Sequence, residues 1–119
     1  MKTGRARSTG LALIAAGLAT AVAVRAKRTH RAYNFRGKSV VITGGSRGLG
    51  LVLARQLASE GARITLIARN EHELRRAADD IHNRQSAADV LIVPADVGDR
   101  EHVERVISQV ISHYGGIDV

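Results

Sequence analysis

Residues 40–70 read VVITGGSRGLGLVLARQLASEGARITLIARN. A β-branched apolar run ends at Gly44 and Gly45, and after Gly48 the apolar residues recur at helical spacing. A second apolar run then ends at Arg69. The stretch therefore predicts a buried strand, a glycine-rich turn, a helix and a second buried strand.

The helix of this unit has a predicted packing face and a predicted end. Its large apolar residues fall on one side of a helical wheel: Leu49, Val52, Leu53 and Leu57. Gly61 stands where a helix C-cap is expected. We expect this face to cover the sheet.

The same alternation continues to the end of the chain. Asn70 and Glu73 form a capping box that opens a helix running through Ile81, and residues 89–96 (DVLIVPAD) read as a third strand. Asp99 and Glu101 place acid at the start of another helix. That helix carries an apolar stripe: Val103, Val106, Ile107, Val110 and Ile111. Residues 115–119 (GGIDV) look like the opening of a fourth strand.

This order of strands and helices predicts the fold class. Strands that alternate with helices form a parallel sheet covered on both faces. We expect an α/β fold with a Rossmann-like doubly wound parallel sheet, of which residues 38–119 are the incomplete N-terminal half.

The glycine turn has the chemistry of an anion site. The first amides of a helix have no internal partner, and the helix dipole adds roughly half a positive charge there. Gly44 and Gly45 permit a sharp turn, Gly48 permits close approach of a diphosphate, and Gly50 permits close packing of helix on strand. The spacing T-G-x-x-x-G-x-G is neither G-x-G-x-x-G nor a Walker loop, and its place in a βαβ unit predicts dinucleotide binding.

Two arginines bear on which dinucleotide binds. Enzymes that use NAD place a carboxylate about 20 residues after the glycine turn to bind the ribose 2′-hydroxyl. Residues 62–69 contain no acid, whereas Arg69 ends the strand and Arg47 lies in the turn. Guanidinium groups there would bind the 2′-phosphate of NADP, so we favour NADP over NAD. The alternative is that both arginines are solvated surface residues.

The segments TGGSRGLG (43–50), the end of the second strand, and PADV (94–97) together resemble the N-terminal half of a short-chain dehydrogenase/reductase. The resemblance covers residues 37–119 and implies a Rossmann-type oxidoreductase that transfers hydride between NAD or NADP and a carbonyl or alcohol substrate. It implies that Ser46 and Asn70 help hold the 2′-phosphate, that Asp96 binds the adenine amino group, and that Val97 lines the adenine pocket. Helix capping is the alternative role of Asp96, although Asp99 is better placed for it.

The candidate cofactor-binding residues are accordingly Thr43, Gly44, Ser46, Arg47, Gly48, Leu49, Gly50, Arg69, Asn70, Asp96 and Val97. The family's catalytic Ser and Y-x-x-x-K motif have no counterpart here, because neither Tyr33 nor Tyr114 is followed by a lysine four residues later. We therefore expect the chain to be a fragment that is inactive alone. A non-catalytic nucleotide-binding module is one alternative, and a Rossmann-like methyltransferase is a more remote one. The resemblance also implies homo-oligomers.

Charge separates the N-terminal arm from the rest. Residues 1–38 hold nine basic residues and no acid, whereas residues 39–119 hold nine arginines against eleven acids, a net charge of −2. A nucleic-acid-binding domain would carry its basic patch on the folded body, so we expect no nucleic-acid partner. The five histidines are scattered, cysteine is absent, and we expect no metal site.

Residues 9–24 (TGLALIAAGLATAVAV) contain no charge and are flanked by basic residues. Three interpretations stay open: a short membrane anchor, a cleaved signal peptide, or a loosely structured extension. We treat residues 1–24 as an apolar N-terminal segment, 25–37 as a basic linker and 38–119 as the dinucleotide-binding domain. The anchor interpretation predicts that this domain lies on the cytoplasmic side of a membrane.

Overall fold

The computed structural model describes residues 15–19 and 32–119. The chain divides into two units, Met1–Tyr33 and Asn34–Val119, which are described separately. In the first unit, residues 15–19 are helical and exposed. No helix in the described ranges is both long and apolar enough to cross a membrane. The anchor predicted at residues 9–24 falls mostly outside these ranges.

The second unit alternates strands and helices as predicted. Its elements are β1 (Ser39–Thr43), α2 (Gly48–Ser59), β2 (Arg63–Ala68), α3 (Glu71–Arg84), β3 (Asp89–Pro94) and α4 (Arg100–Tyr114). The strands pair in parallel in the order β1-β2-β3, and Ser39, Arg63 and Asp89 lie opposite one another at their amino ends. The predicted parallel α/β fold is confirmed.

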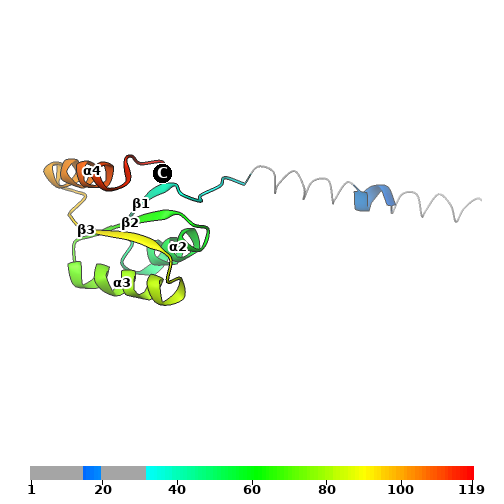
Figure 1. Cartoon of the computed structure of the whole chain (residues 1–119), viewed down its shortest axis with the longest axis horizontal. Helices are drawn as coiled ribbons and strands as arrows, with labels where there is room; N and C mark the ends of the chain where they lie inside the picture. The colour runs from blue at the N-terminus through cyan, green and yellow to red at the C-terminus, as the bar shows by residue number, and fades with distance from the viewer. Residues whose placement is uncertain (1–14, 20–31) are drawn as a thin grey trace, which may run out of the picture. The chain divides into compact units, whose positions relative to one another are not determined.

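Helices cover both faces of this sheet. Helices α2 and α3 lie on one face and α4 lies on the other (Figure 1). Ile64 and Leu66 of β2 pack on the first face with Leu74 and Ile81 of α3, whereas Ile67 packs on the second face. Because β2 is buried from both sides, it needs the continuous apolar run that the sequence shows.

The packed face of α2 differs from the predicted one. Leu57 is buried as expected, but its buried partners are Ala54 and Ala58, and 83% of Leu49 is exposed. Val52 and Leu53 are also exposed. The prediction of these three as core residues was wrong, because a row of small side chains, Gly50, Ala54 and Ala58, brings the helix close to the sheet and turns its large side chains outward.

Helix α4 shows the same partial agreement. Val106 and Val110 of the predicted stripe are buried, whereas Ile107 and Ile111 are exposed. The buried face is completed by Tyr114, whose hydroxyl donates a hydrogen bond to Asp89 Oδ1 at 2.8 Å. Burial, reinforced by Asp89, raises the pKa of Tyr114 above its ordinary value. Tyr114 thus fastens the end of α4 to the amino end of the sheet.

The last residues of the chain lie along β1. Val41 N donates to Val119 O at 2.8 Å, and Asp118 N donates to Ser39 O at 2.9 Å. Ser39 N in turn donates to Asp118 Oδ2 at 2.8 Å. The predicted fourth strand is not formed as a regular strand, but its backbone already occupies the position beside β1 where such a strand would pair.

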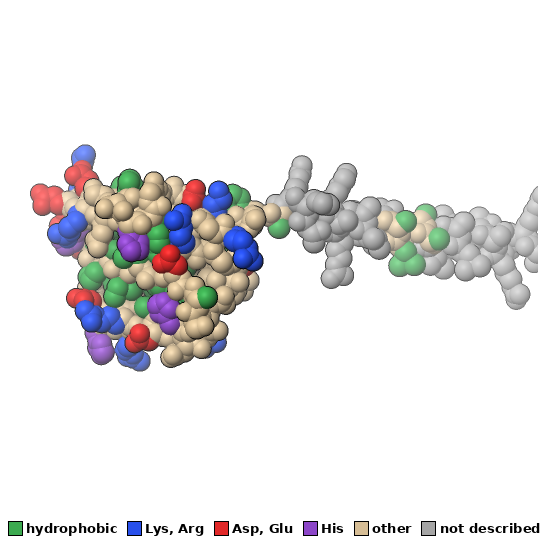
Figure 2. Space-filling model, in the orientation of Figure 1, with side chains coloured by type: hydrophobic (Ala, Val, Ile, Leu, Met, Phe, Trp, Pro, Cys, Tyr) green, Lys and Arg blue, Asp and Glu red, His purple; other side chains and the backbone are tan. Residues whose placement is uncertain are grey.

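The surface of the second unit mixes charges of both signs. Figure 2 shows basic and acidic side chains interspersed on the visible face of this unit. Ion pairs within this unit include Arg55 with Asp80 and Arg100 with Glu104. Neither sign dominates this visible face.

Candidate functional site

A cavity of about 500 Å³ lies at the carboxyl ends of the three strands. In open α/β sheets, ligands bind at this edge. The cavity is lined by Gly44, Ser46, Arg47, Ile67, Ala68, Arg69, Asn70, Glu73, Ala95, Asp96 and Val97. Seven of the eleven predicted cofactor-binding residues are among them, so the fold brings the glycine turn, the end of β2 and the PADV segment into one site.

The glycines of the turn fall into two structural kinds. Gly44 and Gly48 have φ angles of +68° and +58°, and a β-carbon on either would meet nothing within 4 Å. Gly45 and Gly50 are tightly packed instead, since a β-carbon on Gly50 would lie 2.4 Å from Gly44 O. The first pair shapes the turn and leaves open space in front of it. Gly50 lets the helix press against the turn, and Gly45 lets the turn pack on Leu66 of β2.

The start of α2 is left without a cap. Its N-cap residue is Arg47, with extended backbone angles of φ −159° and ψ 174°, and no side chain accepts a hydrogen bond from the first amides. The first turn contains no acid. A helix start in this state offers amide donors and a positive dipole end to an anion.

Two predicted arginines stand beside this helix start with their charges unpaired. Arg47 and Arg69 are exposed and line the cavity. Within residues 32–119 neither forms an ion pair, whereas Arg55 and Arg75 are paired with Asp80 and Glu71. Both free guanidinium groups are thus available to a phosphate.

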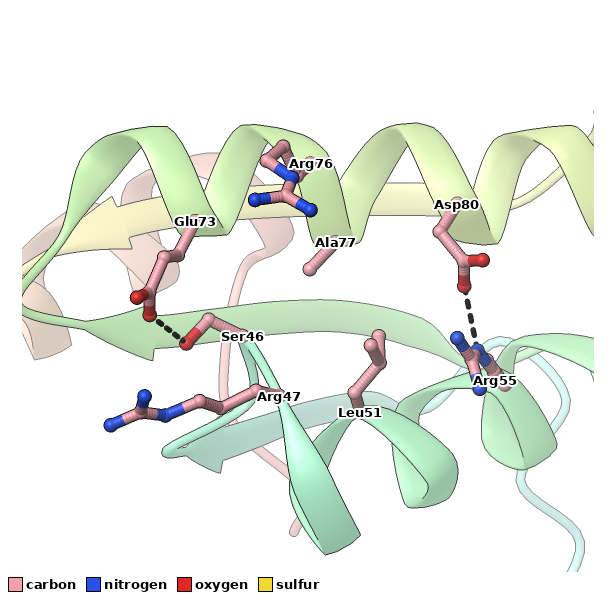
Figure 3. Close-up of a pocket in the computed structure, with 8 residues that line it drawn as sticks. All are labelled: Ser46, Arg47, Leu51, Arg55, Glu73, Arg76, Ala77 and Asp80. Carbon is pink, nitrogen blue, oxygen red and sulfur yellow. Dashed lines mark hydrogen bonds and ion pairs between the residues drawn. The ribbon is translucent and has the colours of Figure 1, made fainter.

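The sequence did not predict that Glu73 would belong to the site. Its carboxylate Oε2 accepts a hydrogen bond from Ser46 Oγ at 3.3 Å, so an acid of α3 lies against the glycine turn. Figure 3 shows Glu73 pointing from α3 toward Ser46, with Arg47 close by on the turn. A capping-box glutamate is expected to contact the start of its own helix. The path of the chain from β1 to α3 brings Glu73 beside the glycine turn instead.

Asn70 serves as the N-cap of α3, as predicted. Its Oδ1 accepts hydrogen bonds from the backbone amides of His72 and Glu73 at 2.9 and 3.2 Å. Only this half of the capping box is seen, because the Glu73 side chain turns to Ser46. With its oxygen engaged, Asn70 has its amide N–H groups left for a phosphate.

Asp96 and Val97 form the far wall of the cavity. Asp99, not Asp96, caps α4 by accepting from Glu101 N and His102 N, as the sequence suggested. One Asp96 oxygen nevertheless accepts from Gly98 N at 2.9 Å, and Asp96 N donates to His102 Nδ1 at 3.1 Å. The loop is therefore fixed by local hydrogen bonds, and the second carboxylate oxygen remains for a ligand.

Thr43 and Leu49 lie outside this cavity. Thr43 lines a separate apolar cavity of about 200 Å³ between β1 and α4. Leu49 projects from the first turn of α2 into solvent. Gly48 and Gly50, the other two predicted residues outside the lining, belong to the adjacent turn and helix start. Among the described residues, no group of three or more His, Asp or Glu side chains could hold a metal ion.

A second cavity, of about 370 Å³, adjoins the first between α2 and α3. It shares Ser46, Arg47 and Glu73 with the first cavity and extends past Arg76 to Asp80 (Figure 3). The hydrogen bond from Arg55 to Asp80, 2.6 Å long, holds the pKa of that carboxyl below its ordinary value. This ion pair lies at one end of the groove, and the other end is formed by Ser46, Arg47 and Glu73, which also line the first cavity.

Comparisons with known proteins agree with this geometry. A family model described as short chain dehydrogenase matches residues 38–119. The chain is 42% identical over 85 residues to 11-beta-hydroxysteroid dehydrogenase B of Sesamum indicum, covering 71% of this chain and 23% of that protein. The chain spans about a quarter of the length of the curated relatives it matches.

Solved structures give the same result. A metagenomic short-chain oxidoreductase in complex with NADP superposes with a TM-score of 0.67 at 30% identity, covering 73% of this chain and 38% of that one. An NAD+-bound xylitol dehydrogenase superposes with a TM-score of 0.67 at 29% identity, covering 72% and 32%. The two neighbours thus carry different dinucleotides on the same framework.

Proposed function

Because the chain belongs to the short-chain dehydrogenase family, we propose that it forms the NADP-binding part of an oxidoreductase that moves hydride to or from a carbonyl or alcohol carbon. The nicotinamide supplies the hydride chemistry when the dinucleotide is bound. The residues of this chain supply binding and orientation.

The site fits a dinucleotide at three points. The uncapped amides of α2 and the open space before Gly44 and Gly48 suit the diphosphate. Asp96 and Val97 stand at the opposite wall, where the resemblance places adenine. Between them lies the end of β2, where the 2′ position of the ribose is expected.

The choice of NADP rests on one observation. Arg47 and Arg69 both line the cavity and have no ion-pair partner among the described residues. Unpaired guanidinium groups bind a phosphate with charge-assisted hydrogen bonds that a hydroxyl cannot match. The NADP-bound and NAD+-bound neighbours support a nicotinamide cofactor without favouring either form.

Arg69→Asp is the decisive variant for this proposal. It replaces the attraction for a 2′-phosphate with repulsion, so we expect the Kd of NADP to rise by about 100-fold and that of NAD to change by less than about threefold. Titration calorimetry on the full chain measures both constants. Arg105→Asp is the matched control, because Arg105 is exposed on α4 and lines neither cavity. Equal losses for NADP and NAD in Arg69→Asp would identify Arg69 as an ordinary surface residue.

Binding and turnover are separate properties of this chain. The 119 residues contain no Y-x-x-x-K motif, and Tyr114 is fixed at the amino end of the sheet, opposite the cavity. We expect dinucleotide binding without reduction of any carbonyl compound by the chain alone. An absorbance assay of NADPH oxidation with a panel of aldehydes and ketones checks this, and sustained oxidation would contradict it.

The proposal extends to the location of the protein. Free dinucleotide is mainly intracellular, so the domain belongs on the cytoplasmic side, with residues 9–24 as an anchor flanked by basic residues. Fractionation of cells that express the chain with and without residues 1–24 tests the anchor: membrane recovery should depend on that segment.

A further inference from the structure

Glu73 brings a negative charge into the part of the cavity where a 2′-phosphate would bind. Its side chain is partly buried and lines both adjoining cavities. Its Oε2 lies 3.3 Å from Oγ of Ser46, the residue that precedes Arg47 in the chain (Figure 3). Apart from Asp96 on the far wall, the cavity therefore holds two guanidinium groups and the Glu73 carboxylate.

The position of this carboxylate is fixed from two sides. The backbone amide of Glu73 donates to Oδ1 of Asn70, the N-cap of α3, at 3.2 Å, which fixes the first turn of this helix. The side chain is held from the other side by the Ser46 hydroxyl. The carboxylate is thus directed at the glycine turn.

The charge of Glu73 is not neutralised by a neighbour. Its helix neighbours Glu71 and Asp80 are paired, Glu71 with Arg75 at 2.6 Å and Asp80 with Arg55 and Arg84. Within residues 32–119, Glu73 has a hydroxyl partner and no ion pair. No ion pair therefore competes with a ligand in the cavity for this carboxylate.

A carboxylate at this place discriminates between the two dinucleotides. It repels the dianionic 2′-phosphate of NADP, whereas it can accept a hydrogen bond from the 2′-hydroxyl of NAD. We propose that Glu73 is a specificity-determining residue that offsets part of the NADP preference created by Arg47 and Arg69. This inference rests on the proposed function. It gives Glu73 of α3 the role that a carboxylate at the end of β2 has in enzymes that use NAD.

Glu73→Gln tests the proposal with little change of shape, since glutamine can still accept the Ser46 hydrogen bond. We expect NADP to bind about five- to tenfold more tightly and NAD to bind equally or up to about threefold more weakly. The measurement is the Kd of each dinucleotide for the full chain by titration calorimetry at low salt. At about 1 M salt the gain for NADP should shrink, because exposed charges are screened.

Glu71→Gln is the matched control, because Glu71 has the same chemistry in the same helix turn but pairs with Arg75 outside the cavity. An unchanged ratio of the two constants in Glu73→Gln would overturn the inference while the proposed function stands. If Glu73 had a purely structural role, Glu73→Gln would weaken the binding of both dinucleotides together, and that result would also overturn the inference. If the wild-type chain binds neither dinucleotide, the proposed function itself fails.

Discussion

The N-termini of α2 and α4 are built in opposite ways, although both follow a strand of the same sheet. Helix α4 begins with Asp99, whose carboxylate accepts two amide hydrogen bonds, and with Glu101 in its first turn. Helix α2 begins with Arg47, which caps nothing, and has no acid in its first turn. Asp99 satisfies two of the amide donors at the start of α4, whereas no side chain caps the amides at the start of α2, which remain available to a ligand.

This difference shows where the molecule gives up stability for binding. Capping residues contribute about 1 kcal/mol each, and α2 does without that contribution. The glycines before α2 add a further cost, since they increase the entropy of the unfolded chain. Such choices are expected where a site depends on exposed backbone amides.

The largest effect is expected from Gly50→Ala. Alanine normally stabilises a helix relative to glycine by about 1 kcal/mol. Here its β-carbon would lie 2.4 Å from Gly44 O, a backbone atom that cannot rotate away. We expect a net loss of about 2–3 kcal/mol in the free energy of unfolding and at least about a 100-fold loss of dinucleotide affinity, as the turn is displaced.

Urea denaturation and calorimetry measure the two effects. Gly116→Ala is the control, because a β-carbon on Gly116 meets nothing within 4 Å and its stability should stay within about 0.5 kcal/mol of wild type. A Gly50→Ala chain with wild-type stability and affinity would mean that α2 is not pressed against the turn.

Gly48→Asn separates backbone strain from blockage of the site. Asparagine tolerates the left-handed conformation, so the φ of +58° should cost less than about 1 kcal/mol. Its side chain would fill the open space at the start of α2, and we expect the Kd of both dinucleotides to rise by about 30-fold.

Gly115→Asn is the matched control for this variant. Gly115 has a φ of +83°, open space around it, and a place at the far end of α4. It should lose similar stability without any change in affinity. Identical affinities for the two variants would show that the glycine turn does not face the dinucleotide.

Arg47→Asp would give α2 a side-chain N-cap like the one that Asp99 provides for α4. The extended backbone of Arg47 already suits an N-cap, so aspartate should accept from the first amides and raise the free energy of unfolding by about 0.5–1 kcal/mol. The same cap competes with the diphosphate, and we expect NAD affinity to fall by about tenfold. NAD is the ligand of choice because it has no 2′-phosphate. Arg47→Ala, which removes the arginine without adding a cap, should leave NAD affinity within about threefold.

Much of the fold was predictable from the sequence because local signals agreed with one another. The strand ends, the caps Asn70 and Asp99, and the glycine turn each depend on a few neighbouring residues. The packed face of α2 was not predictable from periodicity alone. Leu49, Val52 and Leu53 form a helical stripe as regular as that of Gly50, Ala54 and Ala58. The sheet packs against the stripe of small residues.

The candidate site was predictable where a residue acts through its own segment. Arg47, Arg69 and Asp96 each lie within two residues of the start or end of an element, and parallel strands bring such positions together. The contact of Glu73 with Ser46 joins residues 27 positions apart, and the Asp96–His102 hydrogen bond depends on how the β3–α4 loop folds. Both arise from tertiary geometry that no local pattern encodes.

The smallest predicted effect compares the two helix starts without any ligand. Asp99→Ala removes a side chain that accepts from two amides, and it should cost about 1 kcal/mol, or a fall in Tm of about 4–8 °C for a domain of this size. Arg47→Ala removes a residue that caps nothing, so its Tm should stay within about 2 °C of wild type. Thermal denaturation followed by circular dichroism measures both. If the two variants lost equal stability, Arg47 would be supporting the start of α2, and its amides would not be free for a diphosphate.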